Sequence, residues 1–409
     1  MRIVIIEQWF SEKMGYAENC LPKALAALGH EVHVIASTAQ VYFDAPFYRD
    51  VYEPYLGPPV LTPGEKSLDG FTLHRLPLER WHGRLRLRGL LGRLHALRPD
   101  VVQTFHATTL TTYLAALGRL TCGYKLFTGN HEVKSVFAPA RLAGPPSQAA
   151  RVNWLVRLSL PGRAVGWLTE KCYAVTPDAA DIATRFYGVP AAKIQLSPLG
   201  VDTALFCPPH DEPTYAAREA LRHQLGFVES DIVCIYTGRF TVAKNPGCLA
   251  KAVAILSAQG LTFRGLFVGE GPQIEDVASV PGCAVRPFAP YHDLPTYYRA
   301  ADIGVWPMEE STSMLDAAAC GLPIITNGRL QALDHLVGGW LPYQAGDASD
   351  LARALLMLRD APERHRMGQA GAEVIRRQYS WDTIASRRLA DYEAAQCPAR
   401  SVHPRGKAA

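Results

Sequence analysis

Short apolar runs alternate with longer amphipathic stretches along almost the whole chain. The apolar runs have the length of buried strands; they cover residues 3–6, 32–36, 71–76, 101–105, 125–128, 233–236, 266–268, 284–288, 303–306 and 324–326. The stretches between them repeat apolar residues at helical spacing; they cover residues 16–28, 86–97, 151–172, 178–187, 248–259, 294–300, 316–320, 351–359 and 381–395. Strands that alternate with helices predict parallel sheets covered by helices, which is the α/β class.

The alternation of strand and helix patterns is interrupted near residues 198–209, where prolines and a glycine are concentrated. A chain of 409 residues is too long for one ordinary core, so two domains of roughly 200 residues are expected. We predict an N-terminal domain over 1–203, a C-terminal domain over 204–379, a final helix over 380–396 and a flexible tail over 397–409. Residues 40–70 show little periodicity and are interpreted as an excursion from the first core.

Composition adds that the protein is an ordinary globular one, with 48% apolar and 20% charged residues. The nine cysteines show no paired C-x-x-C spacing, which favours reduced thiols in a cytoplasmic protein over a zinc site or a disulfide framework. The first apolar run is too short for a signal-peptide core, and no run approaches a membrane span.

The net charge of +4 is unevenly distributed. Residues 1–200 contain 22 Lys+Arg against 15 Asp+Glu, and the remainder contains 20 against 23. The arginines concentrate between residues 80 and 98 and again between 151 and 163. A basic first half suits anionic lipid or an acidic acceptor, whereas plain solvation is the simpler interpretation. The leucine stripe of residues 85–97 favours core packing, with lipid contact by its arginine face as the alternative.

Polar and acidic residues follow the strand at 303–306. Glu309, Glu310, Ser311, Thr312 and Ser313 lie between this strand and the next helix, which carries Asp316. In open parallel sheets, ligands bind beyond the carboxyl ends of the strands. Carboxylates and hydroxyls there suit sugar hydroxyls; a helix cap with a solvated first turn remains the alternative.

A second polar loop follows the strand at 233–236 and contains Gly238, Arg239 and Lys244. A guanidinium and an ammonium five residues apart suit a diphosphate. The spacing is not that of a P-loop, and two solvated surface cations are the alternative. Gly15 lies at another loop–helix junction, where a glycine lets a ligand approach the backbone.

Six blocks in order resemble retaining glycosyltransferase family 4, of the GT-B fold, over nearly the whole chain. The blocks are Gly15-x-Ala17-Glu18 with Leu28-Gly29-His30-Glu31-Val32, Pro198-Leu199-Gly200-Val201-Asp202, Gly238-Arg239…Lys244-Asn245, Val268-Gly269-Glu270-Gly271-Pro272, Leu294-Pro295…Ala301-Asp302, and Asp316-Ala317-Ala318-Ala319-Cys320-Gly321-Leu322-Pro323. The chain departs from the family's Glu-x7-Glu motif, because Met308 stands where the first acid belongs. Either Glu309 or Glu310 would then act as that acid on a shortened loop.

The resemblance implies two Rossmann-like domains facing a cleft, with the C-terminal helix packing back on the N-terminal domain. It implies a UDP-, GDP- or ADP-sugar as donor, retention of configuration, and neither cofactor nor metal. Arg239 and Lys244 would stabilise the departing diphosphate, Asp316 would bind the ribose, and His131 would approach the sugar. The implied donor site also includes Gly15, Gly238, Arg286, Phe288, Glu309, Glu310 and the backbone amides of Ser311, Thr312, Ser313 and Met314.

The acceptor is left open as a glycan, a glycolipid or a small polar molecule, and no nucleic acid is expected. The composition looks bacterial. We expect a cytoplasmic protein, with peripheral contact at the inner face of the cell membrane as an option. Two alternatives remain: a GT-B sugar-nucleotide epimerase, and a non-catalytic sugar-nucleotide-binding subunit.

Overall fold

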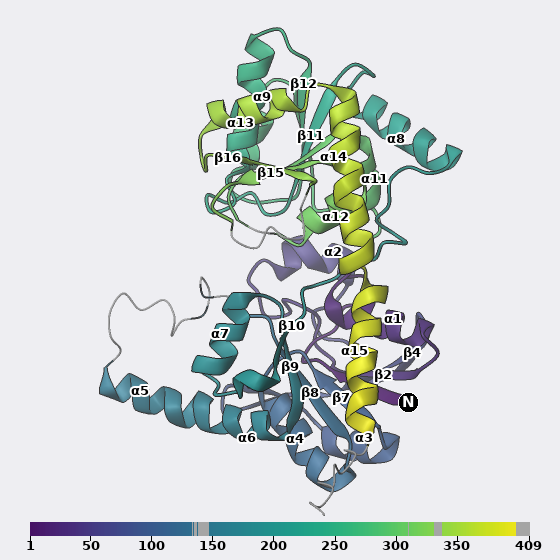
Figure 1. Cartoon of the computed structure of the whole chain (residues 1–409), viewed down its shortest axis with the longest axis vertical. Helices are drawn as coiled ribbons and strands as arrows, with labels where there is room; N and C mark the ends of the chain where they lie inside the picture. Colours follow the sequence, from purple (N-terminus) through teal and green to yellow (C-terminus); the bar gives the residue numbers. More distant parts are fainter. Residues whose placement is uncertain (133, 135–136, 138–146, 310, 331–337, 398–409) are drawn as a thin grey trace, which may run out of the picture.

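Two lobes, each built on its own sheet, lie one above the other in the computed structural model (Figure 1). The structure describes residues 1–132, 134, 137, 147–309, 311–330 and 338–397. None of the helices in these ranges is long and apolar enough to cross a membrane. The α/β class with two Rossmann-like sheets, expected from the alternating pattern, is confirmed.

The N-terminal lobe contains an eight-stranded sheet in the order β10-β9-β8-β7-β1-β2-β4-β3. Its strands are β1 (Arg2–Ile6), β2 (Glu31–Ser37), β3 (Gly64–Leu68), β4 (Phe71–Leu76), β7 (Val101–Thr104), β8 (Lys125–Asn130), β9 (Thr169–Ala174) and β10 (Ile194–Leu196). All neighbours pair in parallel except β3, which runs antiparallel to β4 at the sheet edge. A separate hairpin joins β5 (Leu78–Trp81) to β6 (Arg84–Leu87).

The C-terminal lobe contains a fully parallel six-stranded sheet in the order β13-β12-β11-β14-β15-β16. Its strands are β11 (Ile232–Thr237), β12 (Phe263–Val268), β13 (Cys283–Arg286), β14 (Ile303–Trp306), β15 (Ile324–Asn327) and β16 (Trp340–Tyr343). The strand order reverses between β11 and β14, since β12 and β13 lie on one side and β15 and β16 on the other. Ligands of open α/β sheets bind at such a switch point.

Helices cover both sheets and connect the parallel strands. Those of the N-terminal lobe are α1 (Ala17–Ala27), α2 (Glu53–Leu56), α3 (Leu90–Leu97), α4 (Leu110–Cys122), α5 (Gln148–Trp154), α6 (Leu160–Leu168) and α7 (Pro177–Arg185). Those of the C-terminal lobe are α8 (Glu212–Gln224), α9 (Pro246–Ala258), α10 (Ile274–Ala278), α11 (Leu294–Ala300), α12 (Ser313–Ala319), α13 (Ala348–Met357) and α14 (Ala361–Val374).

Several expected elements have different boundaries or a different type. The helix expected at 86–97 is a hairpin strand followed by α3, and Leu87, Leu90 and Leu94 are buried. Core packing of these leucines is therefore confirmed, whereas lipid contact by the arginine face stays a prediction. The helix expected at 151–172 stops at Leu168, because β9 enters the sheet there. The sequence pattern also missed β3, β5, β10, β16, α2, α4, α8, α10 and α14.

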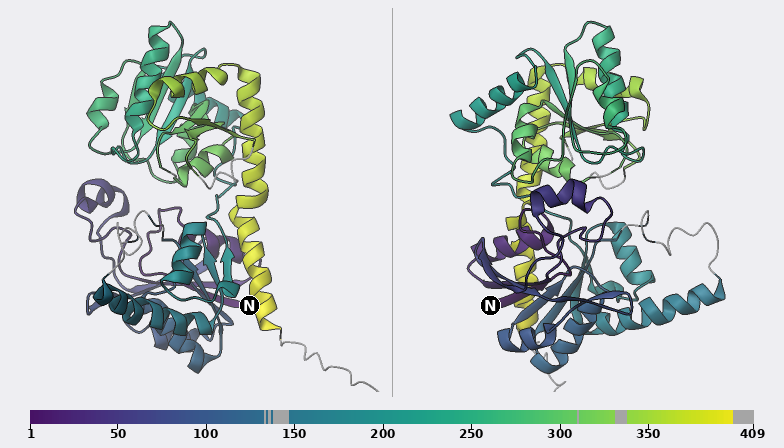
Figure 2. Two further views of the ribbon diagram at one scale, coloured as in Figure 1. Left: turned by 60° about the vertical axis from the view of Figure 1, so that its left-hand side comes forward. Right: turned by 180° about the vertical axis from the view of Figure 1, so that it is seen from behind.

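One nearly continuous helical column joins the two lobes. It consists of α14, a π-helical turn over Ile375–Tyr379, and α15 (Trp381–Gln396), and in the left view of Figure 2 it runs beside both lobes. Although it follows the C-terminal lobe in sequence, α15 packs on the N-terminal lobe, where Trp381, Ile384 and Tyr392 join the core of α1 and β1. The connection at residues 197–202 lies alongside, with Gly200 so close that a Cβ there would come within 2.7 Å of the Trp381 ring.

We expect Tyr392→Ala to destabilise the N-terminal lobe by about 3–5 kcal/mol, as for other buried aromatic truncations. Tyr392 is fully buried, stacks edge-on against Phe127 at 4.7 Å and donates its hydroxyl to Gln103. Urea unfolding followed by circular dichroism measures the change. Glu393→Ala, at the neighbouring exposed position of α15, is the control and should shift the midpoint little. Equal midpoints for the two variants would show that α15 does not support this lobe.

Candidate functional site

A cavity of about 530 Å³ opens at the carboxyl ends of the C-terminal strands and is roofed by the other lobe. Its floor follows β11, β12, β13 and β14, and its roof consists of Phe47, Val51 and Tyr52 from the N-terminal lobe. The lining comprises Phe47, Val51, Tyr52, Thr237, Gly238, Arg239, Thr241, Val268, Gly269, Glu270, Gly271, Pro272, Phe288, Ala289, Leu294, Ser311 and Ser313. The volume lies within the range of small-molecule sites.

Two glycines in the loop after β12 create the floor of this cavity. A Cβ on Gly269 would lie 2.0 Å from the Gly238 carbonyl oxygen, and one on Gly271 would lie 2.5 Å from that of Phe240. Both have a φ that L side chains rarely adopt, +144° and +149°. The loops after β11 and β12 can therefore pack backbone against backbone, which leaves open space above them.

The two cations expected to bind a diphosphate follow β11. Arg239 is exposed and lines the cavity. The Lys244 ammonium forms an ion pair with Glu309, with Nζ 3.0 Å from Oε2. This pair joins the loop after β11 to the loop after β14, so the cationic and acidic motifs meet in space. Gly238, which separates Arg239 from the strand, also lines the cavity.

The hydroxyl-rich loop after β14 is held by Trp306 at the strand's end. The Trp306 indole N–H donates to the Thr237 carbonyl at 3.1 Å and to Ser313 Oγ at 3.0 Å. Ser311 Oγ lies 2.6 Å from Ser313 Oγ, and both serines line the cavity. Ser313 is thus positioned by two strands rather than acting as a simple helix cap.

The remaining residues of that loop differ in their placement. Glu310 lies outside the described residues. Thr312 is exposed and is not part of the cavity lining. Met314 does not fit the expected donor contact, because its side chain is buried in the core and its amide donates to the Ser311 carbonyl at 3.1 Å. The amide is therefore already used in the turn that begins α12.

Asp316 faces the junction of the lobes rather than the cavity itself. It is half-buried, and burial together with the charge of Asp202 raises the pKa of its carboxyl to about 8. Asp202 lies in the linker and pairs with Lys23 of α1 at 2.8 Å. The side-chain carboxyl of Asp316 has no hydrogen-bond partner among the described residues, so this group remains available to a hydroxylated ligand at the edge of the cleft.

Gly15 meets an aromatic ring of the other lobe. A Cβ built on Gly15 would lie 2.0 Å from the ring of Tyr291, and Tyr291 packs against Phe206 of the linker at 5.2 Å. Gly15 does not line the cavity. The glycine therefore permits close approach, as expected, but in this arrangement the group that approaches is Tyr291 and not a ligand.

Four titratable residues gather at the carboxyl ends of the N-terminal strands. Glu7 follows β1, His106 follows β7, His131 follows β8, and Glu18 lies in the first turn of α1. His106 Nε2 is 3.6 Å from Glu7 Oε1, and the rings of His106 and His131 are 6.1 Å apart. Of these four residues, only His131 was predicted as a site residue, and Glu18 was noted only within the Gly15-x-Ala17-Glu18 block. Glu7 and His106 carry no signature that distinguishes them from other loop residues.

Burial and mutual charge set the protonation of this group. Burial, with the charges of His106 and Arg388, lowers the pKa of His131 to about 3, so its imidazole is neutral. Burial alone would lower the pKa of His106, but Glu7 outweighs it and the pKa is raised. Burial and the charge of Glu7 raise the pKa of Glu18 to about 8. A neutral His131 can exchange hydrogen bonds with hydroxyl groups.

The roof of the cavity was not predicted, because residues 40–70 show little periodicity and were interpreted as an excursion from the first core. This segment contains a π-helical turn over Tyr48–Tyr52 and then α2. Tyr52 and Tyr55 reach across to Phe288, with ring centroids 5.5 and 6.1 Å away. The density of aromatics between residues 42 and 55 was the available signal. Phe288 lines the cavity as expected, whereas Arg286 ends β13 without lining it.

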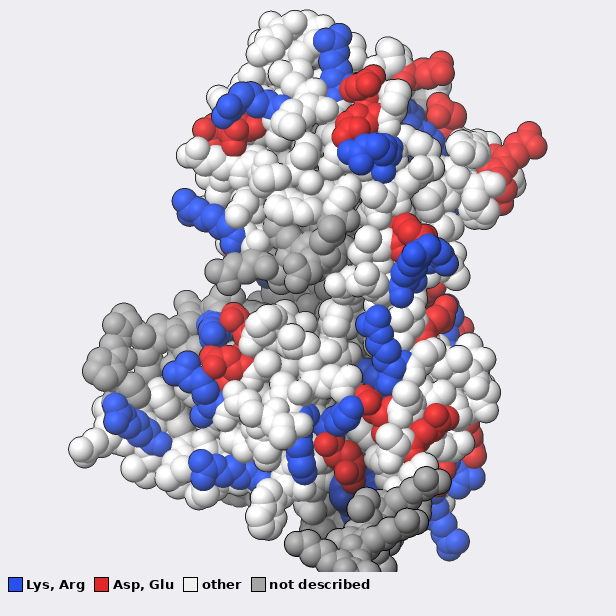
Figure 3. All heavy atoms as spheres, in the orientation of Figure 1, with Lys and Arg blue, Asp and Glu red and all other residues white. Residues whose placement is uncertain are grey.

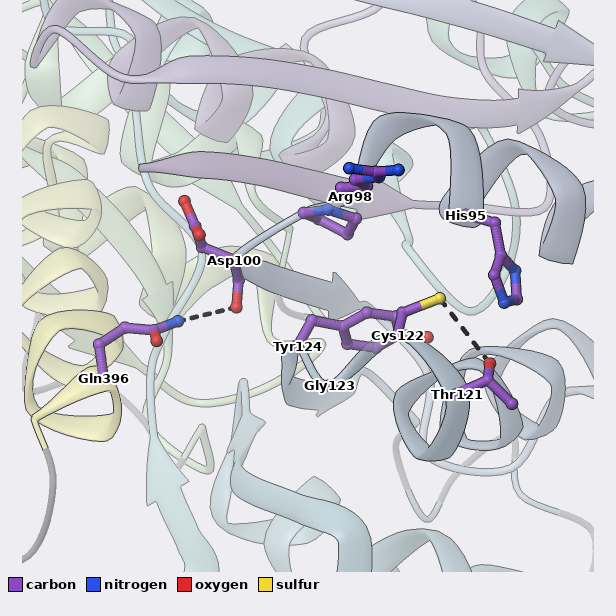
Figure 4. A pocket seen from close by; sticks show the side chains of 9 residues that line it. His95, Arg98, Asp100, Thr121, Cys122, Gly123, Tyr124 and Gln396 are labelled. Atoms are coloured by element: carbon purple, nitrogen blue, oxygen red, sulfur yellow. Dashed lines mark hydrogen bonds between the residues drawn. The ribbon is translucent and has the colours of Figure 1, made fainter.

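A second hollow, of about 440 Å³, lies in the N-terminal lobe, at the other end of the sheet's strands (Figure 4). Arg98, Asp100 and Cys122 line it, and Gln396 closes one side by donating to the Asp100 carbonyl at 2.8 Å. Its residues precede β7 and β8, so it lies at the amino ends of the strands.

Among the described residues no group of three or more His, Cys, Asp or Glu could hold a metal ion.

The arrangement of two Rossmann-like lobes around this cleft is the GT-B fold. HepE from Anabaena, solved in complex with UDP, has a similar structure, with a TM-score of 0.66 and 16% identity over 96% of this chain and 100% of that one. At that identity the likeness shows the fold alone.

The chain belongs to glycosyltransferase family 4. Its residues 21–205 match the family described as Glycosyltransferase Family 4, and residues 231–360 match Glycosyl transferases group 1. A D-inositol 3-phosphate glycosyltransferase of Segniliparus rotundus is 31% identical over 56% of this chain and 53% of its own length. A GDP-mannose-dependent alpha-(1-6)-phosphatidylinositol monomannoside mannosyltransferase of Mycobacterium tuberculosis is 26% identical over 64% and 76%. The chain spans about half the length of the first of these relatives.

We expect Asp316→Asn to flatten the pH dependence of stability. Because the folded pKa is about 8, the native carboxyl keeps a proton that the unfolded chain releases above about pH 4. The contribution of this carboxyl to the free energy of unfolding is therefore highest at low pH, where the group is protonated in both states, and it falls as pH rises toward 8. The variant should therefore exceed the parent at pH 8.5 by more than ~1 kcal/mol and match it near pH 4.

Thermal unfolding midpoints at several pH values measure this difference. Glu229→Gln, which removes an exposed carboxylate, serves as the control. Part of the slope should persist in Asp316→Asn because the pKa of Glu18 is also raised. Parallel curves for Asp316→Asn and the parent would contradict the assigned burial of Asp316.

Proposed function

We propose that this protein transfers a sugar from a nucleoside diphosphate sugar to a hydroxyl group of an acceptor, with retention of configuration and without a metal ion. The observation that carries the proposal is the cavity at the switch point of the C-terminal sheet, with Arg239 on its wall and the Lys244–Glu309 pair beside it. The family of the chain consists of glycosyltransferases, which supports the reaction class.

The nucleotide would occupy the apolar part of the cavity. Gly269, Gly271 and Pro272 give a flat floor, and Phe288 and Tyr52 present aromatic rings at its margin. A nucleobase gains about 1–3 kcal/mol from stacking on an aromatic side chain. The ribose would extend toward Asp316, whose raised pKa falls again when hydroxyl groups donate to its ionised form.

The diphosphate would lie over Arg239 and Lys244. As the bond to the sugar breaks, negative charge develops on the leaving phosphate, and fixed cations stabilise that charge more than they stabilise the bound donor. Arg239 supplies a planar fork and Lys244 a point charge. Glu309 pairs with Lys244, so donor binding would exchange one anionic partner of this lysine for another. Ser311 and Ser313 would donate hydroxyl hydrogens nearby.

The acceptor would bind against the N-terminal lobe, where Glu7, Glu18, His106 and His131 gather. Neutral His131 and the carboxyl groups of Glu7 and Glu18 suit a polyhydroxylated molecule. The relatives named for inositol 3-phosphate and for phosphatidylinositol mannoside support an acceptor of this kind, either free or lipid-linked. The structural neighbour HepE is solved with UDP, and one relative is named for GDP-mannose, so the base is left to experiment.

An epimerase acting on the donor itself is the second candidate. Removing and returning a proton at a sugar carbon needs acids and histidines around the ring, and the four titratable residues of the N-terminal lobe give this alternative a specific basis. A third candidate, a binding subunit without catalysis, rests on the shortened acidic loop, in which Met308 stands where the family motif has its first acid.

Incubation with UDP-, GDP- and ADP-sugars, with and without inositol phosphate and phosphatidylinositol mannoside, separates these candidates. Nucleotide release that requires an acceptor is the expected result. Interconversion of donors without an acceptor would identify the epimerase. Nucleotide binding without turnover would identify the binding subunit, and no binding of any nucleotide would refute the proposal.

Replacing Lys244 by Ala should lower kcat by on the order of a hundredfold or more, as for loss of one group that stabilises transition-state charge. Steady-state kinetics with saturating donor measures the loss. Lys251→Ala, an exposed lysine on α9, is the matched control and should retain parental turnover. A Lys244→Ala enzyme with near-parental kcat would remove Lys244 from the phosphate site.

Treatment with EDTA should leave transfer largely intact, because Arg239 and Lys244 supply the positive charge that a divalent ion supplies in metal-dependent transferases. Initial rates before and after chelation, at constant ionic strength, measure the effect. Complete inactivation that Mg²⁺ or Mn²⁺ reverses would contradict the metal-free mechanism.

A further inference from the structure

One helical run of the N-terminal lobe presents apolar side chains on two opposite faces. It consists of α5, a π-helical turn over Leu155–Ser159, and α6. At 1.5 Å per residue the run is about 30 Å long. In Figure 1 and in the right view of Figure 2 it extends beyond the rest of the lobe, on the side away from α15.

The inner face is firmly packed. A Cβ on Gly162 would lie 2.2 Å from the Tyr187 carbonyl oxygen, and one on Gly166 would lie 3.0 Å from Pro190. Trp154 packs edge-on against Phe186 at 6.0 Å, and Ser159 Oγ donates to the Phe186 carbonyl at 2.6 Å. These contacts fix the rotation of the helix about its own axis, so its outer face is defined.

The outer face is apolar and exposed among the described residues. Val152, Val156, Leu160 and Trp167 are 59%, 55%, 51% and 84% exposed. The first three are spaced by four residues and therefore follow one line along a helix. Single exposed apolar residues are ordinary, whereas a continuous line of them marks an interaction surface. We name this line, together with the arginines described next, the 148–168 ridge.

The charges on the ridge have one sign. Residues 148–168 contain Arg151, Arg157 and Arg163 and no acidic residue, and all three arginines are exposed. The lower left of Figure 3 shows Lys and Arg side chains over this part of the lobe. Arginine has a long apolar stem and a charged tip, so it suits a boundary between an apolar phase and anionic groups.

We propose that the 148–168 ridge docks on an anionic lipid bilayer, with Val152, Val156, Leu160 and Trp167 at the acyl boundary and the arginines at the headgroup phosphates. Apolar burial and electrostatic attraction add in such binding. The ridge lies outside the proposed sugar-nucleotide cavity, so the inference does not depend on the proposed function.

A second copy of the chain is a less suitable occupant of the ridge. Two ridges in contact would bring six arginines together without an acidic residue from either helix, and like charges in an interface oppose association. An anionic bilayer instead supplies the opposite charge over the full length of the run. Charge complementarity therefore favours lipid.

Co-sedimentation of the full chain with vesicles tests the proposal. Binding to vesicles of equal phosphatidylcholine and phosphatidylglycerol should exceed binding to pure phosphatidylcholine, and it should weaken as salt rises. The variant with Arg151→Gln, Arg157→Gln and Arg163→Gln should bind the anionic vesicles on the order of a hundredfold more weakly. The variant with Val152→Ser, Val156→Ser and Trp167→Ser should lose about tenfold or more, since apolar burial drives insertion.

Matched controls come from exposed positions on the other lobe. Val228→Ser and Met357→Ser remove side chains that are 58% and 65% exposed, and Arg359→Gln removes an exposed arginine; these variants should bind like the parent. Unchanged thermal midpoints and nucleotide binding show that the ridge variants are folded. Equal binding of the parent to neutral and anionic vesicles, or full binding by both ridge variants, would overturn the proposal. A lipid-free dimer that both ridge variants abolish would assign the ridge to a second copy instead.

Discussion

The contact between the loops that follow β11 and β12 is the constraint on which the cavity depends. Gly238 N–H donates to the Val268 carbonyl at 3.0 Å, and Phe240 N–H donates to the Glu270 carbonyl at 2.8 Å, so backbone pairing continues past the ends of the strands. Gly269 and Gly271 allow this approach because a side chain at either position would collide with the neighbouring backbone. The loops therefore stay flat, and Arg239 projects from them toward the other lobe. Any larger residue would fill the floor on which a ligand could lie.

Charged groups lie on both sides of the cleft. The C-terminal lobe contributes the cations Arg239 and Lys244, with the acids Glu309 and Asp316 close by, whereas the N-terminal lobe contributes Glu7 and Glu18 together with two histidines. Burial raises the pKa of Glu18 and of Asp316 to about 8, so both carboxyl groups change charge near neutral pH. Such perturbed groups are frequent at functional sites. This arrangement suits a donor that carries phosphate on one side and an acceptor that carries hydroxyl groups on the other.

The lobes are also tied together mechanically, by contacts close to the cavity and far from it. Tyr52 and Tyr55 contact Phe288 at its roof, and Tyr291 lies against Gly15 outside its lining. On the far side, the column of α14 and α15 spans both lobes. A change in the angle between the lobes would therefore alter the roof, and the segment over residues 42–55 belongs to the site as much as the strand ends do.

The sequence alone determined the α/β class, the two-lobe organisation and the positions of the main polar loops, because these depend on local periodicity and on residues close together in the chain. Arg239, Ser311 and Ser313 were found in this way, since each follows a strand whose end is readable from its apolar run. The tertiary structure alone determined which segments contact one another and which side chains are buried. It turned Met314 into the core, placed Tyr291 against Gly15, brought residues 47–52 over the cavity, buried the leucines at 87–94 and left Val152, Val156 and Trp167 exposed. Each of these outcomes depends on contacts between segments far apart in sequence, and an apolar residue looks the same in the sequence whether a neighbour covers it or not.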